Sequence, residues 1–407
     1  MYQNLKNKNN IIQVLIVGYL LRIFFSFFGH NVDWLGIKQH ISFTMGGVDT
    51  YSYMKTYPYF PSRFYLEIIS TNISEYLDLS SFLFINFERL LMISIYFLVQ
   101  SSVLIYCKEE LPKRLFNYFN ISFVLAFVSG FGNQLDAFVL ITTISLLFKV
   151  DKTFEKKTLF ISGFLFFIFL SMKPITALIY IPLLFIYKSK KNFIYFLIGN
   201  MVSLIINWLI WFNTSLLGIQ FDVNSVLPSI LKYKGFNNFP LLDLLNMNFS
   251  LKLSYLKFGN HLNARNLLII LFIFFLTKKL YKLKNLDLNH IIFYYLIYTF
   301  IFAPQIAQQN LPILFIAINF YRIEKIKSHL TFIEVVTTIY LLLLNMFFVV
   351  EGYISNQDYL LVKLFNVLNY YGLAFIPNEF YFGNFIVLAL VYLTYFESNK
   401  TQYNDNI

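Results

Sequence analysis

The segment FIYFLIGNMVSLIINWLIWF, residues 193–212, decides the fold class of this chain. It contains no charged side chain, and its length matches the roughly 20 helical residues that cross a hydrocarbon core of about 30 Å. A helix keeps all of its backbone hydrogen bonds inside the segment, which makes it stable in lipid. We therefore expect a transmembrane helix at 193–212.

Similar apolar runs recur along the whole chain and predict an all-α polytopic membrane protein, a single integral-membrane domain over residues 1–407. We expect about twelve transmembrane helices, with a range of roughly ten to thirteen, from the length of each run. The predicted spans are 11–29, 81–106, 115–131, 135–149, 158–172, 175–187, 193–212, 266–277, 290–303, 307–321, 331–350 and 382–396. The segment 359–376 is either a further span or an interfacial helix.

The composition supports this class. Apolar residues make up 58% of the chain and charged residues only 13%, and the mean hydropathy is +0.61, which argues against a soluble protein. The single cysteine, Cys107, excludes an intramolecular disulfide and a cysteine-based metal site. The first apolar run is long and ends without a small-residue cleavage site, so we interpret it as a retained span.

The basic residues predict the orientation. With the N-terminus in the cytoplasm, cytoplasmic segments hold 20 of the 32 basic residues and the longer outer segments hold ten. Cytoplasmic loops of membrane proteins carry this excess of Lys and Arg. The net charge of +11 therefore reflects topology and lipid contact, not nucleic-acid binding. The long outer segments are then the loops 30–80, 213–265 and 351–381.

The first outer loop carries five of the 21 acidic residues. Asp33 follows the first span and could accept a proton from an attacking alcohol, as a general base does. Asp49 is the second candidate, although its glycine-rich turn also suits an Asp that bonds local backbone donors. Glu67, Glu75 and Asp78 lie on a predicted amphipathic helix in the membrane interface, and we interpret them as its solvated face.

Polar residues at three further outer positions are candidate substrate ligands. Gln134 and Asp136 open the span 135–149, where they either face a cavity or cap the helix. Lys173 ends the next span and either meets a phosphate or extends to the interface as an ordinary lysine. Gln305, between two late spans, either hydrogen-bonds a polyhydroxylated ligand or caps a helix.

Three ionisable residues, Arg22, Glu88 and Arg89, fall inside predicted spans. Such groups are costly in lipid, so we expect them to face a cavity or a partner, although Glu88 and Arg89 could also lie near the interface. The histidines have no metal-ligand spacing, and no nucleotide-binding or Ser-triad motif stands out. The sequence names no certain cofactor, and a divalent metal at the outer carboxylates stays an alternative.

Several short elements occur in a fixed order, and all but the Lys-Lys pair and the Ser-Gly pair fall on the predicted outer face. They are Asp33, Gly47-Val-Asp-Thr-Tyr51, Tyr57-Pro-Tyr-Phe-Pro61, Gly132-Asn-Gln134-Leu-Asp136, Lys156-Lys157, Ser162-Gly163 and Lys173-Pro174. This order resembles the GT-C superfamily of integral-membrane glycosyltransferases, which use polyprenyl-phosphate sugars as donors. The Gly132-Asn-Gln134-Leu-Asp136 element matches the family's Gly-Gln-x-Asp element with one inserted residue.

The resemblance implies that Asp33 is the catalytic base of an inverting sugar transfer on the outer face. The donor would be a polyprenyl-phosphate-linked sugar and the acceptor a lipid-linked or envelope glycan. Lys173 or Arg265 would hold the donor phosphate, and Tyr51 and Tyr57 would stack on sugar faces or anchor the loop.

Two other functions stay open, a flippase or exporter of lipid-linked saccharides and a polysaccharide polymerase. A bacterial inner membrane fits best, and a eukaryotic endoplasmic reticulum would give the same sidedness.

Overall fold

The structure of the chain is a computed structural model. It describes residues 2–28, 41, 46, 61–77, 81–82, 85–131, 135–172, 192–212, 224–226, 257–258, 262–263, 271, 274, 288, 292, 296, 315–316, 334–339 and 342.

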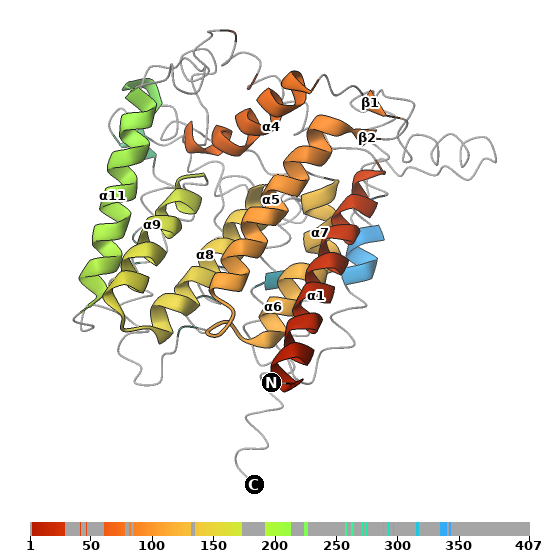
Figure 1. Cartoon of the computed structure of the whole chain (residues 1–407). Coiled ribbons are helices and arrows are strands. Elements are labelled where there is room, and N and C mark those ends of the chain that lie inside the picture. Colours follow the sequence, from red (N-terminus) through yellow and green to blue (C-terminus); the bar gives the residue numbers. More distant parts are fainter. Residues whose placement is uncertain are drawn as a thin grey trace, which may run out of the picture.

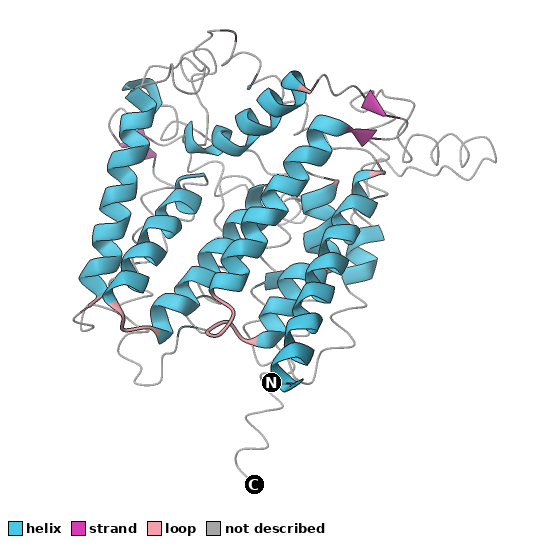
Figure 2. Ribbon diagram, viewed as in Figure 1, coloured by secondary structure: helices cyan, strands magenta, loops and turns pink. Residues whose placement is uncertain are grey.

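The described elements are helices apart from two very short hairpins (Figure 2). The helices are α1 (Tyr2–Ser26), the 3₁₀ turn η1 (Pro61–Arg63), α4 (Phe64–Tyr76), α5 (Phe87–Tyr106), α6 (Lys113–Ile121), α7 (Phe123–Gly130), α8 (Leu135–Lys152), α9 (Lys156–Met172) and α11 (Phe193–Phe212). The antiparallel hairpins pair β1 (Ser81–Phe82) with β2 (Ile85–Asn86) and β3 (Lys257–Phe258) with β4 (Leu262–Asn263). The predicted helical class is confirmed for this part of the chain.

Most predicted spans that fall on described residues coincide with helices. Helix α11 matches 193–212, and α8 and α9 match their predicted spans to within a few residues. Helix α5 begins at Phe87 because the β1–β2 hairpin occupies the start of the predicted span 81–106. The predicted span 115–131 is not one helix but two, α6 and α7. The span 175–187 lies outside the described residues, as do most residues of the spans after 212.

Two of the described helices are long and apolar enough to cross a membrane, Phe87–Tyr106 and Phe193–Trp211, and Asn10–Ser26 is a shorter apolar helix. Helix α11 is also apolar on its outside and polar on its inside. Trp208 and Leu209 are 52% and 63% exposed, whereas Asn200 and Asn207 are buried. This distribution is the reverse of a water-soluble helix and suits a helix that faces lipid.

The long helices run side by side, and α4 crosses one end of the bundle at a steep angle to them (Figure 1). The turn 107–112 and the loop 153–155 lie at the opposite end, near the N-terminus (Figure 2). The first outer loop was expected to contain an interfacial helix, and α4 is a helix within 30–80 that lies across the bundle. We call the two ends the α4 end and the basic end, since the turn and loop at the latter are flanked by Lys and Arg.

Glycines let the helices approach closely at two places. A Cβ on Gly163 of α9 or on Gly199 of α11 would lie less than 3.0 Å from a backbone oxygen of the other helix. Gly18 of α1 and Gly130 of α7 meet α6 and α1 in the same way. Small residues at such crossings allow the backbone-to-backbone packing that drives helix association in membranes.

Candidate functional site

Eight of the nine candidate site residues lie outside the described part of the chain, and for them the sequence-based expectations stand as predictions. They are Asp33, Asp49, Tyr51, Tyr57, Gln134, Lys173, Arg265 and Gln305. Asp136 is the second residue of α8, as expected for a residue that opens a span. Since α8 leads into the loop 153–155 at the basic end, its first turn points toward the α4 end (Figure 1).

Helix α4 is fixed to the bundle by polar side chains on its inner face. The Ser62 hydroxyl donates to the Ser171 hydroxyl of α9 at 2.7 Å. The Tyr65 hydroxyl donates to Asn207 Oδ1 of α11 at 3.0 Å. These bonds tie η1 and α4 to the helices α9 and α11, which are linked to each other by the glycine crossing.

Glu67 completes this network on the side of α5. Its side chain is fully buried, and Oε1 accepts a hydrogen bond from the Tyr96 hydroxyl at 3.0 Å. The expectation that Glu67 belongs to a solvated face is therefore wrong, whereas Glu75 is exposed as expected. Phe64 and Ile68 share the buried face with Glu67, because residues three and four apart lie on one side of a helix. We name the set Ser62, Tyr65, Glu67, Tyr96, Ser171 and Asn207 the α4 layer.

The α4 layer offers a carboxylate, two phenol groups, two hydroxyls and an amide at one end of the bundle. Burial raises the pKa of the Tyr65 hydroxyl above its ordinary value, and the neighbouring Trp211 side chain offsets part of this shift. Tyr65 therefore stays a hydrogen-bond donor over the physiological range. Since the groups of the layer are hydrogen-bonded to one another, they fix α4 against the bundle.

A second polar cluster surrounds the break between α6 and α7. Ser122 has extended backbone angles (φ −63°, ψ 130°), and its hydroxyl caps α7 by accepting from the backbone N–H of Leu125 at 3.3 Å. Stopping α6 at Ile121 releases the carbonyl oxygens of its last turn. Arg22 of α1 donates to two of these, Asn120 O at 2.9 Å and Phe119 O at 3.2 Å.

Side chains from other helices compensate both ends of this break. The Arg22 guanidinium lies at the C-terminal end of α6 and also stacks over the Phe97 ring, 4.9 Å from its centre. The Ser122 hydroxyl, at the N-terminal end of α7, donates to Glu334 Oε1 at 3.2 Å. A cation at a helix C-terminus is stabilising, because it meets the negative end of the helix dipole. We name Arg22, Ser122 and Glu334, with the released carbonyls, the helix break.

The ionisable residues of the predicted spans face partners, as expected. Arg22 contacts carbonyls, and Arg89 is buried and donates to the backbone oxygen of Ser26 at the end of α1. Glu88 accepts a hydrogen bond from Thr71 of α4 at 2.9 Å, which places it at the α4 end of α5. Within the described residues, no group of three His, Cys, Asp or Glu is arranged to hold a metal ion.

Two of these features had signals in the sequence. Asn200, Ser203 and Asn207 recur at the spacing of one helix face within an otherwise apolar span, which indicates an inward polar face. Glu334 is a single carboxylate in the predicted span 331–350, which indicates a buried partner. The burial of Glu67 had no such signal, since Glu67 and Glu75 lie on the same half of the helix and were expected to face solvent together.

Comparison of the chain with protein-family models, with curated protein sequences and with solved structures found no match.

Proposed function

We propose that this chain is an integral-membrane glycosyltransferase of the GT-C type. It has about twelve transmembrane helices, a cytoplasmic N-terminus and an active site at the outer face of a bacterial inner membrane. It moves a sugar from a polyprenyl-phosphate donor to a lipid-linked or envelope glycan acceptor.

The observation that carries this proposal is the position of α4. The chain leaves α1 at Ser26, passes through the segment with Asp33 and Asp49, and returns to the bundle in α4, which is held by side chains of α5, α9 and α11. These bonds hold α4 at one end of the bundle. That end is opposite the end where Lys108, Lys113, Arg114, Lys152, Lys156 and Lys157 gather, so the positive-inside tendency assigns it to the outer face.

The proposed chemistry is an inverting displacement. Asp33 takes the proton of the acceptor hydroxyl while that oxygen forms a bond to the anomeric carbon of the donor sugar. The bond from the anomeric carbon to the phosphate oxygen breaks, and polyprenyl phosphate leaves with the electron pair. Lys173 and Arg265 hold the phosphate and stabilise its growing charge.

The remaining candidates bind the sugar. Tyr51 and Tyr57 stack on its faces, and Gln134, Asp136 and Gln305 hydrogen-bond its hydroxyls. A divalent metal at Asp33 or Asp49 would supply additional charge at the phosphate, and EDTA treatment of the purified protein tests for it.

The decisive experiment uses the full chain reconstituted in proteoliposomes with a panel of polyprenyl-phosphate sugars and membrane-derived glycolipid acceptors. Asp33→Asn is expected to lower the transfer rate by about 10²- to 10⁴-fold, the usual contribution of a general base. Donor binding should be retained, because the substitution keeps the size of the side chain. Glu75→Gln, an exposed position of α4, is the matched control and should leave the rate unchanged.

A wild-type rate in Asp33→Asn, in protein that remains folded, would falsify the assignment of the base. If Asp49→Asn alone abolished transfer, Asp49 would take that role. Absence of any glycosidic bond formation with the whole donor panel would count against the transferase itself.

Export of a lipid-linked saccharide is the second candidate function, and the helix break is the observation that favours it. Transporters place discontinuous helices with buried charges near the middle of the membrane. Proteoliposomes that move a labelled lipid-linked saccharide between leaflets without forming a new bond would support this alternative.

A further inference from the structure

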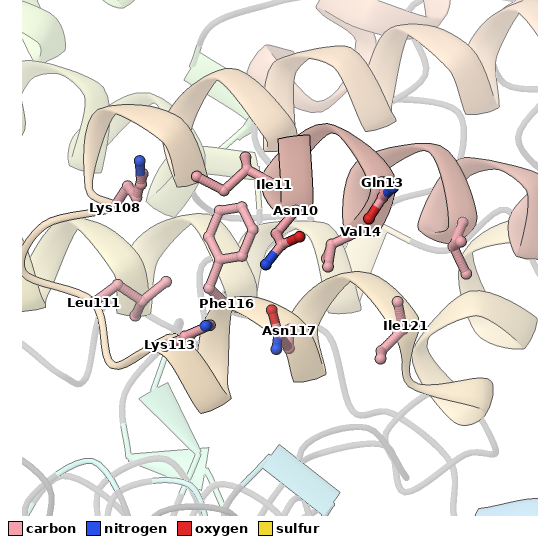
Figure 3. A pocket seen from close by; sticks show the side chains of 11 residues that line it. Asn10, Ile11, Gln13, Val14, Lys108, Leu111, Lys113, Phe116, Asn117 and Ile121 are labelled. Atoms are coloured by element: carbon pink, nitrogen blue, oxygen red, sulfur yellow. The ribbon is translucent and has the colours of Figure 1, made fainter. Parts of the chain in front are cut away.

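A pocket of about 510 Å³ lies at the basic end of the bundle, between α1, the turn 107–112 and α6 (Figure 3). It is separate from the α4 layer, which lies at the other end (Figure 1). Nothing in the proposed sugar transfer uses it. Its chemistry can therefore be considered independently of that function.

One part of the pocket is basic and amide-rich. Lys108 comes from the turn after α5, and Lys113 is the first residue of α6. Within the described part of the chain, neither lysine has an acidic side chain within 4 Å, whereas Lys149 nearby is neutralised by Glu110 at 2.6 Å. Two lysines at one opening without acidic partners attract an anion.

Amide groups add neutral hydrogen-bond donors beside these charges. Asn10 of α1 and Asn117 of α6 face each other across the pocket, and Gln13 lies one turn further along α1 (Figure 3). An anion with several acceptor oxygens, such as a phosphodiester, can use lysines and amides together.

The other part of the pocket is apolar and continues onto the outer surface of α1. Val14, Val17 and Ile121 line it, and Val17 is 47% exposed. Leu20 and Phe24 follow Val17 on the same side of α1 and are 57% and 53% exposed. An apolar row of this kind, leading away from the basic opening along a helix that faces lipid, matches the shape of an acyl chain below its headgroup.

We propose that this pocket binds an anionic phospholipid of the adjacent leaflet, with the phosphate headgroup at Lys108 and Lys113 and one acyl chain along Val17, Leu20 and Phe24. Basic pockets between helices at the cytoplasmic boundary are typical sites for anionic headgroups. The occupant is a lipid and not a free anion, because the apolar half of the pocket and the exposed row on α1 have no role in binding phosphate alone.

Native mass spectrometry of the detergent-purified full chain tests the proposal. Phosphatidylglycerol should be retained in preference to phosphatidylcholine. The double variant Lys108→Gln/Lys113→Gln should lose about 30-fold in affinity for phosphatidylglycerol, since a lysine near an anionic surface is worth about five-fold each. Lys152→Gln/Lys157→Gln is the matched control, because both lysines are exposed at the same end but do not line the pocket; it should bind like the wild type.

A second variant keeps the charges and fills the apolar half. Val17→Trp should weaken phosphatidylglycerol retention at least several-fold with both lysines present, and it should fold, because Val17 is half exposed on the lipid-facing side. The proposal is overturned if phosphatidylcholine is retained equally, if the lysine pairs at and away from the pocket behave alike, or if Val17→Trp binds as the wild type does. Competition by millimolar inorganic phosphate alone would also overturn it, since that result would identify a free-anion site.

Discussion

The α4 layer and the helix break both bury polar groups in an apolar bundle, but they do so in different ways. In the α4 layer, side chains hydrogen-bond to side chains of other helices, as Tyr65 does with Asn207. At the helix break, Arg22 donates to carbonyl oxygens that the end of α6 leaves without helical partners, and Glu334 accepts from the Ser122 hydroxyl that caps α7. The contacts at the break therefore stabilise the bundle as a whole, whereas the contacts of the layer set the position of one helix.

This difference predicts how each region responds to substitution. A carbonyl without a donor in lipid has no water to replace the lost bond, so its cost is the full desolvation penalty. A lost side-chain pair between membrane helices costs much less, because the separated groups find other partners. Substitutions at the break should unfold the protein, and substitutions at the layer should move α4.

The largest effect is expected for Arg22→Leu. It removes the donor for Asn120 O and leaves Phe119 O with only the long bond from Gln100 Nε2 at 3.5 Å. At roughly 1–3 kcal/mol for each unsatisfied carbonyl, this should lower the free energy of unfolding by about 3 kcal/mol. Thermal unfolding in detergent, followed by tryptophan fluorescence, measures this loss. Phe97→Leu, which removes only the ring below the guanidinium, is the control and should cost clearly less. Equal losses in the two variants would show that packing, not carbonyl compensation, holds Arg22.

A smaller effect is expected for Glu334. Replacement by leucine removes the acceptor of the Ser122 hydroxyl at the start of α7, for a loss of about 2 kcal/mol. Glu334→Gln keeps an oxygen acceptor for that hydroxyl, and its loss should be below about 1 kcal/mol. If glutamine costs as much as leucine, the charge and not the hydrogen bond is the stabilising element of the break.

Substitutions in the α4 layer should cost less still. Tyr65→Phe and Asn207→Leu should each destabilise by about 1 kcal/mol, with a coupling energy near 0.6 kcal/mol in the double variant, as measured for hydrogen bonds between membrane helices. If the proposed sugar transfer depends on the position of α4, its rate should fall more steeply than stability in both variants. Loss of stability and activity in the same proportion would argue that the layer is only structural.

The sequence predicted the helices well and their contacts poorly, and the physical reason differs between elements. Hydrophobic length alone defines 193–212, because a span needs no information about its neighbours. The break at Ser122 was missed since no proline or glycine marks it. Asn120 and Ser122 stop the helix there, because their side chains compete for backbone hydrogen bonds. The break is stable because Arg22 and Glu334, which are distant in sequence, bond to the groups that it exposes.

Glu67 shows the same limit at the level of the site. Its helix was predicted, but which face of α4 turns inward depends on Tyr96, Ser171 and Asn207, which lie on other helices. The roles of Asp33, Lys173 and Arg265 rest on the order of the motifs and on the predicted side of the membrane. They stay predictions, which the activity measurements test.

The smallest effect is expected for the reactivity of the Cys107 thiol. Its labelling rate reports how far substitutions in either region loosen the core. It lies in the turn after α5, and burial raises the pKa of its thiol from 9.0 to about 12. As the pH rises, the Cys107 thiol ionises in the unfolded chain before it ionises in the folded protein. Its contribution to the free energy of unfolding is therefore complete below pH 9 and is lost between pH 9 and about 12. A maleimide reacts with the thiolate, so labelling of the folded wild type at pH 8 should be very slow. Its rate should keep rising through pH 10, whereas an exposed thiol levels off near its ordinary pKa of about 8.5.

The matched control is Cys107→Ser/Lys157→Cys, with a single thiol exposed at the same end of the bundle. Cys107 and Arg22 belong to the same packed bundle, so faster labelling of Cys107 in Arg22→Leu would show that the break holds the whole core together. Variants of the α4 layer should leave the labelling rate unchanged, because they shift a helix at the other end. Equal acceleration by both sets of variants would mean that the two regions unfold as one unit, and the distinction between architecture and positioning would then be lost.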